Sequence, residues 1–276
     1  RSQRGRSMSK HHNVKHYPGL RPLTVAFFVY LYAPLLIVII YSFNANRITS
    51  VWTEFSFKWY GSALQNDALM ASVKTSLIVA SIATVVATTI ALLAALAIIR
   101  GKRVRFRKLS ETVVNLPLLL PEIVLAVATL ILFSLIGLQN GMLKLVIAHS
   151  AFCTPFAFLP IRARLQGMSL DFEEAATDLY ASRWTVFRRV TLPLIFPGLF
   201  SGAMLAFLIS MDDFITSNML SSGGTTTLPV YIFSLIRAGT SPELNAIATM
   251  LIVGSLILAT VALTVAARGQ NDNQQN

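Results

Sequence analysis

Charged residues are scarce in this chain of 276 residues, at 13% of the composition, whereas hydrophobic residues make up 54% and the mean hydropathy is +0.63. A typical soluble domain has about 25% charged residues, so the composition argues against a soluble protein. Cysteine is almost missing, because Cys153 is the only one. A lone cysteine excludes an intramolecular disulfide and any cysteine-rich metal site.

Motifs for nucleotide binding and hydrolysis are missing as well. The pattern Gly-x-x-x-x-Gly-Lys-Ser/Thr does not occur, so we do not expect this chain to bind ATP itself. Neither a nucleophile elbow nor a His-Glu-x-x-His motif is found. His149 and Cys153 have the spacing of neighbours on a helix face, but without further ligands nearby we favour packing over a shared metal. We predict that the chain is not an enzyme and binds no metal.

Apolar runs long enough to cross a membrane, which takes about 20 helical residues, dominate the rest of the chain. We predict an all-α membrane protein with six transmembrane helices. A basic, polar tail precedes them at residues 1–22, and a short polar tail follows at residues 268–276. The predicted spans are residues 23–43, 75–99, 112–136, 142–162, 194–220 and 244–267.

Basic residues are distributed unevenly between the two sides that these spans define. With the N-terminus placed in the cytoplasm, 18 of the 23 Lys and Arg residues lie in cytoplasmic segments. The positive-inside rule therefore predicts that both termini are cytoplasmic. The same distribution argues against a nucleic-acid partner despite the net charge of +11. The basic residues lie at helix ends and in short loops, where they meet anionic membrane lipid, and no nucleic-acid-binding motif accompanies them.

A polar stretch at residues 171–193 interrupts the apolar runs, and the charge asymmetry places it in the cytoplasm. We predict a short helical hairpin here that is presented to a partner, with Asp171 as its N-cap and Pro193 ending it before the fifth span. The charged side chains in its first part are Asp171, Glu173, Glu174, Asp178 and Arg183.

This polar stretch resembles the EAA loop of ABC-importer permeases. The matching residues are Glu174-Ala175-Ala176, Ala181-Ser182, Phe187 and Thr191-Leu192-Pro193. Further stretches resemble the permeases of the spermidine/putrescine branch, and the resemblance extends over about residues 23–267. These stretches are residues 32–44, 52–60, 116–124, 205–214, 225–239 and 241–249. The resemblance implies one transmembrane permease domain with the type I ABC-importer (MetI-like) fold, in a multi-pass protein of the bacterial inner membrane.

Tyr180 departs from the family pattern, which has Gly at this position. Glycine there would permit a left-handed turn between two short helices, and tyrosine tolerates such a turn poorly. Either the turn is built differently in this chain or the coupling is altered.

The resemblance also implies a function, a set of partners and a set of coupling residues. The function would be that of a permease subunit of an ATP-driven importer, forming the pathway for a polyamine (spermidine or putrescine) or a similar small cationic solute. The partners would be a second, different permease in a heterodimer, two ATP-binding cassette subunits on the cytoplasmic face and an extracytoplasmic solute-binding protein. ATP and Mg²⁺ would be bound by the ATPase subunits, with no cofactor on this chain. The residues assigned to ATPase coupling are Glu173, Glu174, Ala175, Ala176, Asp178, Ala181, Phe187 and Pro193.

Three carboxylates lie inside the predicted spans, where an ionised side chain costs about 2.5–3.5 kcal/mol. We predict that Asp212, Asp213 and Glu122 line the pathway of a cation, with hydrogen bonding between helices as the alternative. On one continuous helix, Asp212 and Asp213 would point about 100° apart, so only one would face the cavity squarely. Pro117 and Pro121 predict a kink or break in the third span close to Glu122.

The last extracytoplasmic loop contains a short apolar run between Pro229 and Gly239. We predict a surface or re-entrant helix here and assign Tyr231, Phe233 and Arg237 to a candidate gate. Two other functions are considered: a secondary transporter or channel that works without an ATPase, and a structural scaffold. Internal repeats typical of secondary carriers are not evident. A scaffold has no need of buried carboxylates.

Overall fold

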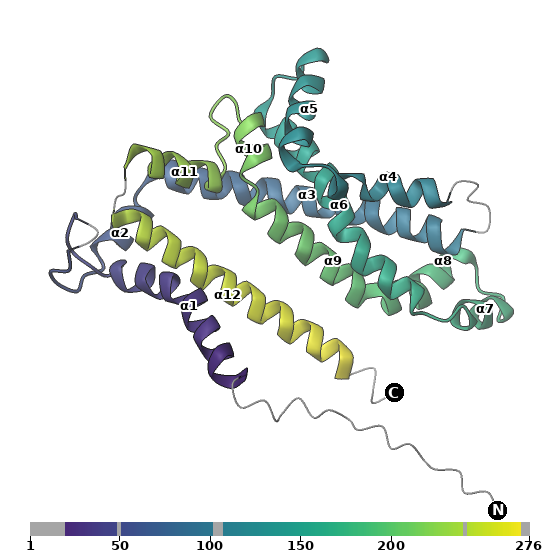
Figure 1. Cartoon of the computed structure of the whole chain (residues 1–276). Coiled ribbons are helices and arrows are strands. Elements are labelled where there is room, and N and C mark those ends of the chain that lie inside the picture. Colours follow the sequence, from purple (N-terminus) through teal and green to yellow (C-terminus); the bar gives the residue numbers. More distant parts are fainter. Residues whose placement is uncertain (1–19, 49–50, 102–106, 240–241, 272–276) are drawn as a thin grey trace, which may run out of the picture.

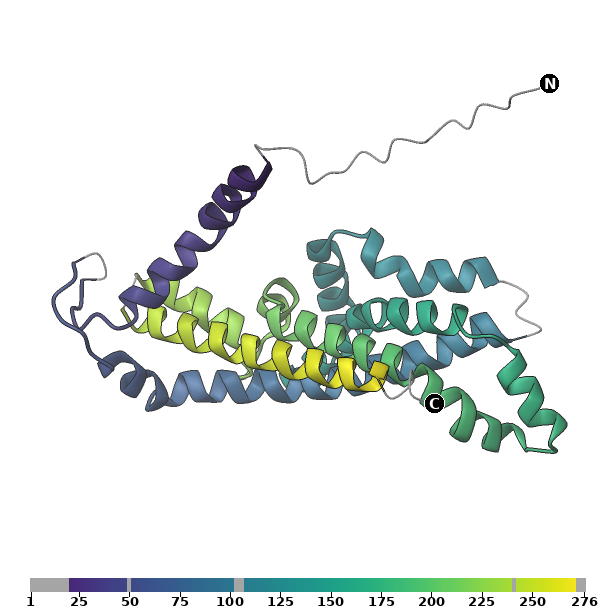
Figure 2. The same ribbon diagram turned by 90° about the horizontal axis from the view of Figure 1, so that it is seen from below.

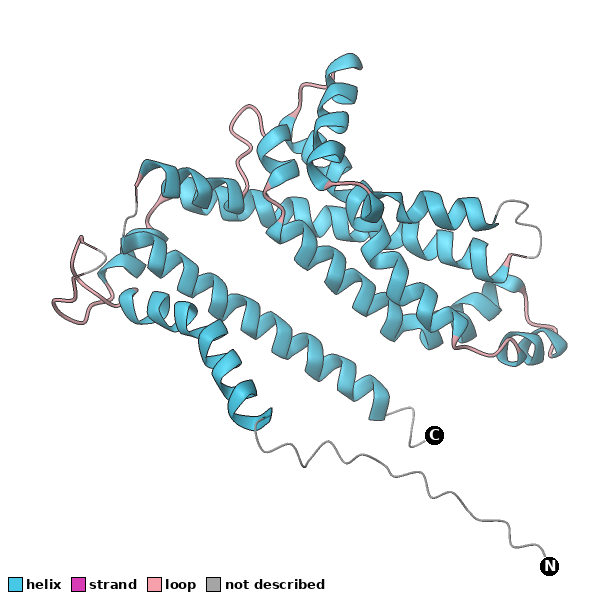
Figure 3. Cartoon of the chain, viewed as in Figure 1, coloured by secondary structure: helices cyan, strands magenta, loops and turns pink. Residues whose placement is uncertain are grey.

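The computed structural model describes residues 20–48, 51–101, 107–239 and 242–271, without the side chains of residues 20, 258, 259 and 261–271. Within these ranges the chain is helical, and its only strand-like contact is an isolated antiparallel bridge between Asn44 and Phe55 (Figure 3). The predicted all-α fold is therefore confirmed. The helices are α1 (Leu20–Tyr41), α2 (Lys58–Leu64), α3 (Asp67–Arg100), α4 (Arg107–Leu119), α5 (Glu122–Leu135), α6 (Gly141–Gln166), α7 (Asp171–Asp178), α8 (Arg183–Val186), the π-helical turn η2 (Phe187–Thr191), α9 (Leu192–Asp212), α10 (Ile215–Leu220), α11 (Leu228–Ala238) and α12 (Pro242–Asn271).

Four helical segments in the described part of the chain are long and apolar enough to cross a membrane: α1, α3, α6 and the continuous run Arg183–Asp212. The bent pair α4 and α5 brings the number to as many as five. The sixth predicted span, 244–267, coincides with α12, whose side chains are described only in part, and it stays a prediction. Most of the predicted N-terminal tail and the last five residues of the C-terminal tail lie outside the described residues.

The third predicted span consists of two helices, α4 and α5, which meet at an angle of 104°. The chain breaks at Pro121, which has an extended backbone with φ −58° and ψ 134°. Proline cannot donate a backbone hydrogen bond and disfavours helical geometry in the residue before it, so the helix ends here. The break expected from the prolines is confirmed at Pro121, whereas Pro117 lies inside α4.

The fifth predicted span begins earlier than expected, because α8, η2 and α9 form one continuous helical run through Pro193. The prediction that Pro193 ends the polar hairpin is wrong. Pro193 lies in the first turn of α9, directly after the π-helical turn. At a helix start the missing N–H of a proline has no regular partner, and a π-helical turn already departs from the α-helical hydrogen-bond pattern.

The core lies where α3, α6 and α9 run side by side (Figures 1 and 2). It joins Ala87, Ala91 and Ala95 of α3 to Phe158 of α6 and Ala206 of α9. The three alanines repeat every fourth residue and so share one helix face. Small residues on such a face allow helix backbones to approach closely, which is the usual way in which helices associate within a membrane.

The polar hairpin and the candidate gate helix lie at opposite ends of this three-helix core. Helices α7 and α8 follow the end of α6, at the end of the core where α3 finishes (Figure 1). Helices α2 and α11 lie at the other end, where α3 begins (Figures 1 and 2). This arrangement agrees with the prediction that the two elements face opposite sides of the membrane.

Two glycines allow α9 to approach α6. A Cβ atom built on Gly202 would lie 2.6 Å from the backbone oxygen of Ala157, and one built on Gly198 would lie 2.6 Å from Cβ of Arg164. The two glycines are four residues apart and form a Gly-x-x-x-Gly pattern, which brings helices together in membranes.

Replacement of Gly202 by alanine is expected to destabilise the protein by about 1–3 kcal/mol, because the added methyl group overlaps a backbone atom that cannot move away alone. For a chain of this size the melting temperature should fall by at least about 2 °C. Thermal unfolding of the detergent-solubilised protein measures the change.

Gly254→Ala in α12 is the matched control, since nothing lies within 4 Å of a Cβ atom built there. Alanine favours a helix over glycine, so this variant should be as stable as the unaltered protein or more so. An equal loss of stability in both variants would contradict the close α6–α9 contact.

Candidate functional site

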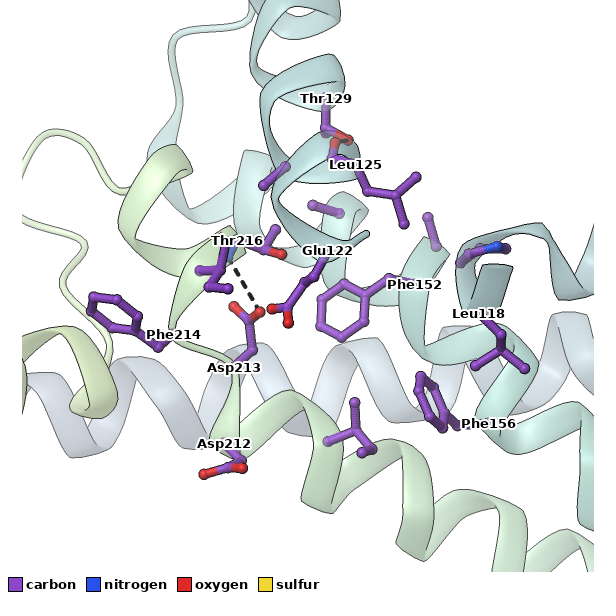
Figure 4. Close-up of a pocket in the computed structure, with 16 residues that line it drawn as sticks. Leu118, Glu122, Leu125, Thr129, Phe152, Phe156, Asp212, Asp213, Phe214 and Thr216 are labelled. Carbon is purple, nitrogen blue, oxygen red and sulfur yellow. Dashed lines mark hydrogen bonds between the residues drawn. The ribbon is translucent and has the colours of Figure 1, made fainter. Parts of the chain in front are cut away.

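A cavity of about 610 Å³ lies between α4, α5 and α6 and the junction of α9 with α10 (Figure 4). Its wall is mainly apolar, but five polar side chains border it. These polar side chains are Glu122, Thr129, Asp212, Asp213 and Thr216. The three predicted pathway carboxylates therefore come together at one cavity, from two segments that lie about 90 residues apart in the chain.

The junction of α9 and α10 is a break in the fifth predicted span. Asp213 has an extended backbone, with φ −64° and ψ 118°, and α9 ends at the residue before it. Its carboxylate accepts hydrogen bonds from the backbone N–H of Ser217 at 2.7 Å and of Thr216 at 3.3 Å. Phe214 takes the cap position of α10, and Asp213 just before it satisfies N–H groups that the first turn leaves unpaired. The prediction of one continuous helix over 194–220 is therefore wrong.

This break also sets the directions of the two neighbouring aspartates. Asp213 is only 6% exposed, and in Figure 4 its carboxylate and that of Glu122 point toward one another. Glu122 is the first residue of α5, directly after the break at Pro121. Asp212 is exposed, and its side chain points away from the other two (Figure 4). Interruptions in two helices thus bring Glu122 and Asp213 face to face.

His149 on α6 connects that helix to the broken segment at the junction of α9 and α10. Its Nδ1 atom lies 2.7 Å from Oγ of Ser210, and its Nε2 atom lies 3.2 Å from Oγ of Ser217 and 3.4 Å from Oδ2 of Asp213. Cys153 bonds separately, with Sγ donating to the backbone oxygen of Ala206 at 3.4 Å. Both side chains thus connect α6 to α9 and α10, as the packing interpretation expects. The described residues contain no group of three or more possible His, Cys, Asp or Glu metal ligands.

Aromatic rings form part of the cavity wall, and sequence reasoning did not single them out. Phe152 and Phe156 lie one turn apart on α6, and Phe214 follows Asp213 (Figure 4). Ring faces attract cations when they are shielded from water. The one signal in the sequence was that Phe152 and Phe156 are spaced to lie on the same face of α6 as His149.

The candidate gate residues divide into two groups. The ring of Phe233 lies 4.5 Å from that of Phe214, and the guanidinium of Arg237 lies 5.4 Å from the ring of Phe233. Tyr231 lies elsewhere, because its hydroxyl accepts a hydrogen bond from Nδ2 of Asn66 at 3.0 Å. Phe233 therefore contacts Phe214, a residue of the cavity wall, and Arg237 contacts Phe233, whereas Tyr231 has no such contact among the described residues.

The polar hairpin forms two short helices, α7 and α8, as predicted. Asp171 is the first residue of α7 and not its cap, because Leu170 takes the cap position. Exposed apolar side chains gather on the hairpin at Leu179, Tyr180 and Trp184. Among the residues assigned to ATPase coupling, Glu174, Ala175, Asp178 and Pro193 are exposed, whereas Glu173, Ala176, Ala181 and Phe187 are partly buried.

Tyr180 makes the left-handed turn that glycine would make in the related pattern. It has φ +58° and is the only non-glycine residue with positive φ in the described part of the chain. The side chain is 99% exposed, so no packing contact offsets the strain of this conformation. The turn at Tyr180 thus has the left-handed geometry that glycine would adopt, and the alternative of a differently built turn is wrong.

Comparison with known proteins gives a consistent set of relatives. The model of the family "Binding-protein-dependent transport system inner membrane component" matches residues 87–269. The putrescine transport system permease protein PotI of Escherichia coli is 36% identical over 249 residues, which cover 88% of this chain and 89% of that protein. The spermidine/putrescine transport system permease protein PotC of the same species is 37% identical over 241 residues, covering 87% of this chain and 91% of that protein.

Solved structures share the fold at low sequence identity. A chain of a bacterial ABC transporter involved in the import of the acidic polysaccharide alginate matches with a TM-score of 0.71 and 18% identity, over 88% of this chain and 94% of that one. A chain of the MetNI methionine ABC transporter in inward-facing conformations matches with a TM-score of 0.57 and 16% identity, over 78% and 97%. The predicted type I importer fold is confirmed.

Replacement of Tyr180 by glycine is expected to stabilise the protein by about 0.5–1 kcal/mol. Relief of a left-handed conformation gains about 1–2 kcal/mol, and the greater backbone freedom of glycine in the unfolded state offsets part of it. Thermal unfolding in detergent measures the effect.

Tyr30→Gly is the matched control, since Tyr30 is another exposed tyrosine but lies within the right-handed helix α1. Glycine there should destabilise the protein by about 1 kcal/mol. A loss of stability at both positions would show that the Tyr180 turn carries no strain.

Proposed function

Because this chain belongs to the family of inner-membrane components of binding-protein-dependent transport systems, we propose that its cavity forms part of the pathway for a polyamine or a similar small cationic solute. The chain is a permease subunit of an ABC importer in the bacterial inner membrane and crosses that membrane several times. It is a transport component and not an enzyme, and the ATPase is a separate subunit. Permeases of such importers work with another permease, with ATPases and with a solute-binding protein.

The observation that carries the proposal is the pair of facing carboxylates, Glu122 and Asp213, in a largely apolar cavity. Asp213 is buried and Glu122 is exposed. Two negative groups held close together repel each other, and a cation between them relieves that repulsion. The rings of Phe152 and Phe156 add faces that favour an ammonium group over an anion. A polyamine carries several separated ammonium groups, and the exposed Asp212 offers a second point of contact beside the pair.

The names of the relatives point to the same solute class. PotI is a putrescine permease and PotC a spermidine/putrescine permease, and each matches almost the whole of this chain. The acidic cavity agrees with that class by its own chemistry, which is a separate line of support. The alternative, a carrier or channel that works without an ATPase, does not account for the binding-protein-dependent family or for the exposed apolar surface of the polar hairpin.

That surface supports docking of an ATPase subunit, which would carry ATP and Mg²⁺. Leu179, Tyr180 and Trp184 are exposed next to the acidic side chains Glu174 and Asp178, which cannot lie in lipid. Exposed apolar residues rimmed by charge are typical of a protein contact. ATP-driven closure of the ATPases would then move the hairpin and the helices attached to it.

A second permease is expected to complete the pathway, and we propose that it is a different chain. Helix α5 exposes Ile131, Leu132 and Leu135, which suits contact with another membrane subunit or with lipid. Phe233 and Arg237, at the end of the core where α2 and α11 lie, are proposed as the gate. Phe233 touches Phe214 and so connects α11 to the cavity. The solute-binding protein would deliver its solute at this end.

Neutralising the carboxylate pair tests the solute class. Glu122→Gln and Asp213→Asn are each expected to lower the uptake of a labelled polyamine by about tenfold or more, since each removes one charged hydrogen-bonding partner of an ammonium group. Asparagine keeps one oxygen that can accept from the first N–H groups of α10, so Asp213→Asn changes the charge more than the fold. Uptake is measured in proteoliposomes that contain the complete transporter.

Asp67→Asn is the matched control, because Asp67 is an exposed acid at the start of α3, outside the cavity. Its uptake should equal that of the unaltered complex. Normal uptake in both cavity variants would rule out the carboxylates as a cation site.

Reversing the charge of Glu174 tests the docking surface. Glu174→Lys is expected to abolish co-purification of the ATPase and ATP-dependent uptake, while the chain still inserts into the membrane, because the side chain is exposed and holds no internal contact in the described structure. Glu54→Lys reverses an exposed charge in the segment between α1 and α2 and should leave the ATPase bound. An ATPase that stays bound to the Glu174→Lys variant would refute the docking role.

A further inference from the structure

Glu173, the neighbour of Glu174, turns away from the exposed surface of the hairpin and toward the membrane helices. We propose that Glu173, Arg100 and Thr191 form a junction that transmits movement of α7 to α3 and α9, which makes Glu173 and Arg100 positioning residues for energy coupling. The inference rests on the proposed docking of an ATPase at the hairpin. It assigns the two adjacent glutamates different roles: Glu174 meets the partner and Glu173 holds the hairpin to the core.

Arg100 supplies the first half of the junction. It is the last residue of α3, and its Nε atom donates to Oε1 of Glu173 at 3.3 Å. Its Nη2 atom donates to the backbone oxygen of Met168 at 3.1 Å, in the short segment between α6 and α7. The guanidinium fork thus joins the end of α3 to α7 and to the chain that leaves α6. Lysine has no such fork and could not reproduce both contacts with the same geometry.

Thr191 supplies the second half. Its hydroxyl donates to the same Oε1 atom of Glu173 at 3.1 Å, and the residue is buried where η2 passes into α9. One carboxylate oxygen therefore accepts hydrogen bonds from the end of α3 and from the start of α9. These two helices and α6 form the core of the protein, so the junction reaches the whole core.

The geometry of α7 explains why the two glutamates differ. Consecutive residues on a helix point about 100° apart, so Glu173 and Glu174 cannot both face the same side. The side chain of Glu173 is 19% exposed and that of Arg100 is 15% exposed, whereas Glu174 is exposed.

Among the described residues, Glu173 makes the only side-chain hydrogen bonds that join α7 to the ends of α3 and α9. None of its residues is buried, so apolar packing contributes little to its position. A largely buried ion pair resists separation, because either charge alone would lose its partner without gaining full contact with water. A force on α7 therefore moves the ends of α3 and α9 before it breaks the junction.

The test uses the complete complex of both permeases, the ATPase and the binding protein in proteoliposomes. In Glu173→Ala and Arg100→Ala, we expect the ATPase to co-purify as with the unaltered chain. The ratio of solute-stimulated to basal ATP hydrolysis should fall by roughly 2- to 30-fold, the range measured when residues that couple two sites are altered. Glu174→Ala is the contrasting variant, because it should lose the ATPase itself.

The double variant Arg100→Ala with Glu173→Ala separates a junction from two independent effects. If the residues act as one unit, the double variant is no worse than either single variant. Effects on the ratio that multiply would overturn the proposal, as would a ratio that stays unchanged. Loss of the ATPase from Glu173→Ala to the extent seen for Glu174→Ala would overturn it too, since Glu173 would then belong to the docking surface.

Thr191→Val covers the case in which an alanine variant fails to fold, because valine keeps the shape of threonine and removes only the hydroxyl. A smaller fall in the same ratio supports the junction, and an unchanged ratio refutes it.

Failure of the proposed function has a different signature. An unaltered complex that is stimulated by another solute but not by polyamines would refute the solute class, and the junction is then tested with that solute.

Discussion

Polar groups that lie among apolar helices must find their partners inside the protein, and the cavity depends on how Asp213 meets this requirement. Its carboxylate accepts the backbone N–H groups of Thr216 and Ser217, which allows α9 to end and α10 to begin within the span. His149 holds the same region against α6. Without these bonds a broken helix would leave backbone groups unsatisfied within a membrane-spanning part of the protein. The break is therefore stable, and a charged group is kept at the cavity.

Helix α9 connects the cavity to the end of the core where the polar hairpin lies. Helix α9 ends at the cavity with Asp212 and begins beside Thr191, which is bonded to Glu173 of the hairpin. Close packing against α6 at Gly202 makes α9 part of a rigid core. A displacement of the hairpin would reach the carboxylates along one helix. That continuity gives a physical route between the proposed ATPase contact and the proposed solute site.

Local chemistry predicted several of these features well. The apolar runs indicated the long helices, and Pro121 indicated the break between α4 and α5, because a proline acts on its own neighbours. The polar hairpin was predicted from its charge and is observed as α7 and α8, whereas its docking role, which the resemblance implies, stays a prediction. Pro193 shows the limit of such reasoning, since the π-helical turn before it could not be read from the residues alone. The break at Asp213 escaped prediction because aspartate ends a helix only when suitable N–H groups are in reach.

The amino-acid sequence by itself determined that this chain is an all-α membrane protein with acidic residues inside its spans and a polar hairpin between them, and its resemblance to ABC-importer permeases indicated the function. These properties depend on composition and on neighbours along the chain. Only the tertiary structure decided that Glu122 faces Asp213, that Phe214 contacts Phe233 and that Glu173 bonds Arg100 and Thr191. Each of these contacts joins residues from different helices. Their distances follow from how the helices bend and pack, which no local pattern encodes.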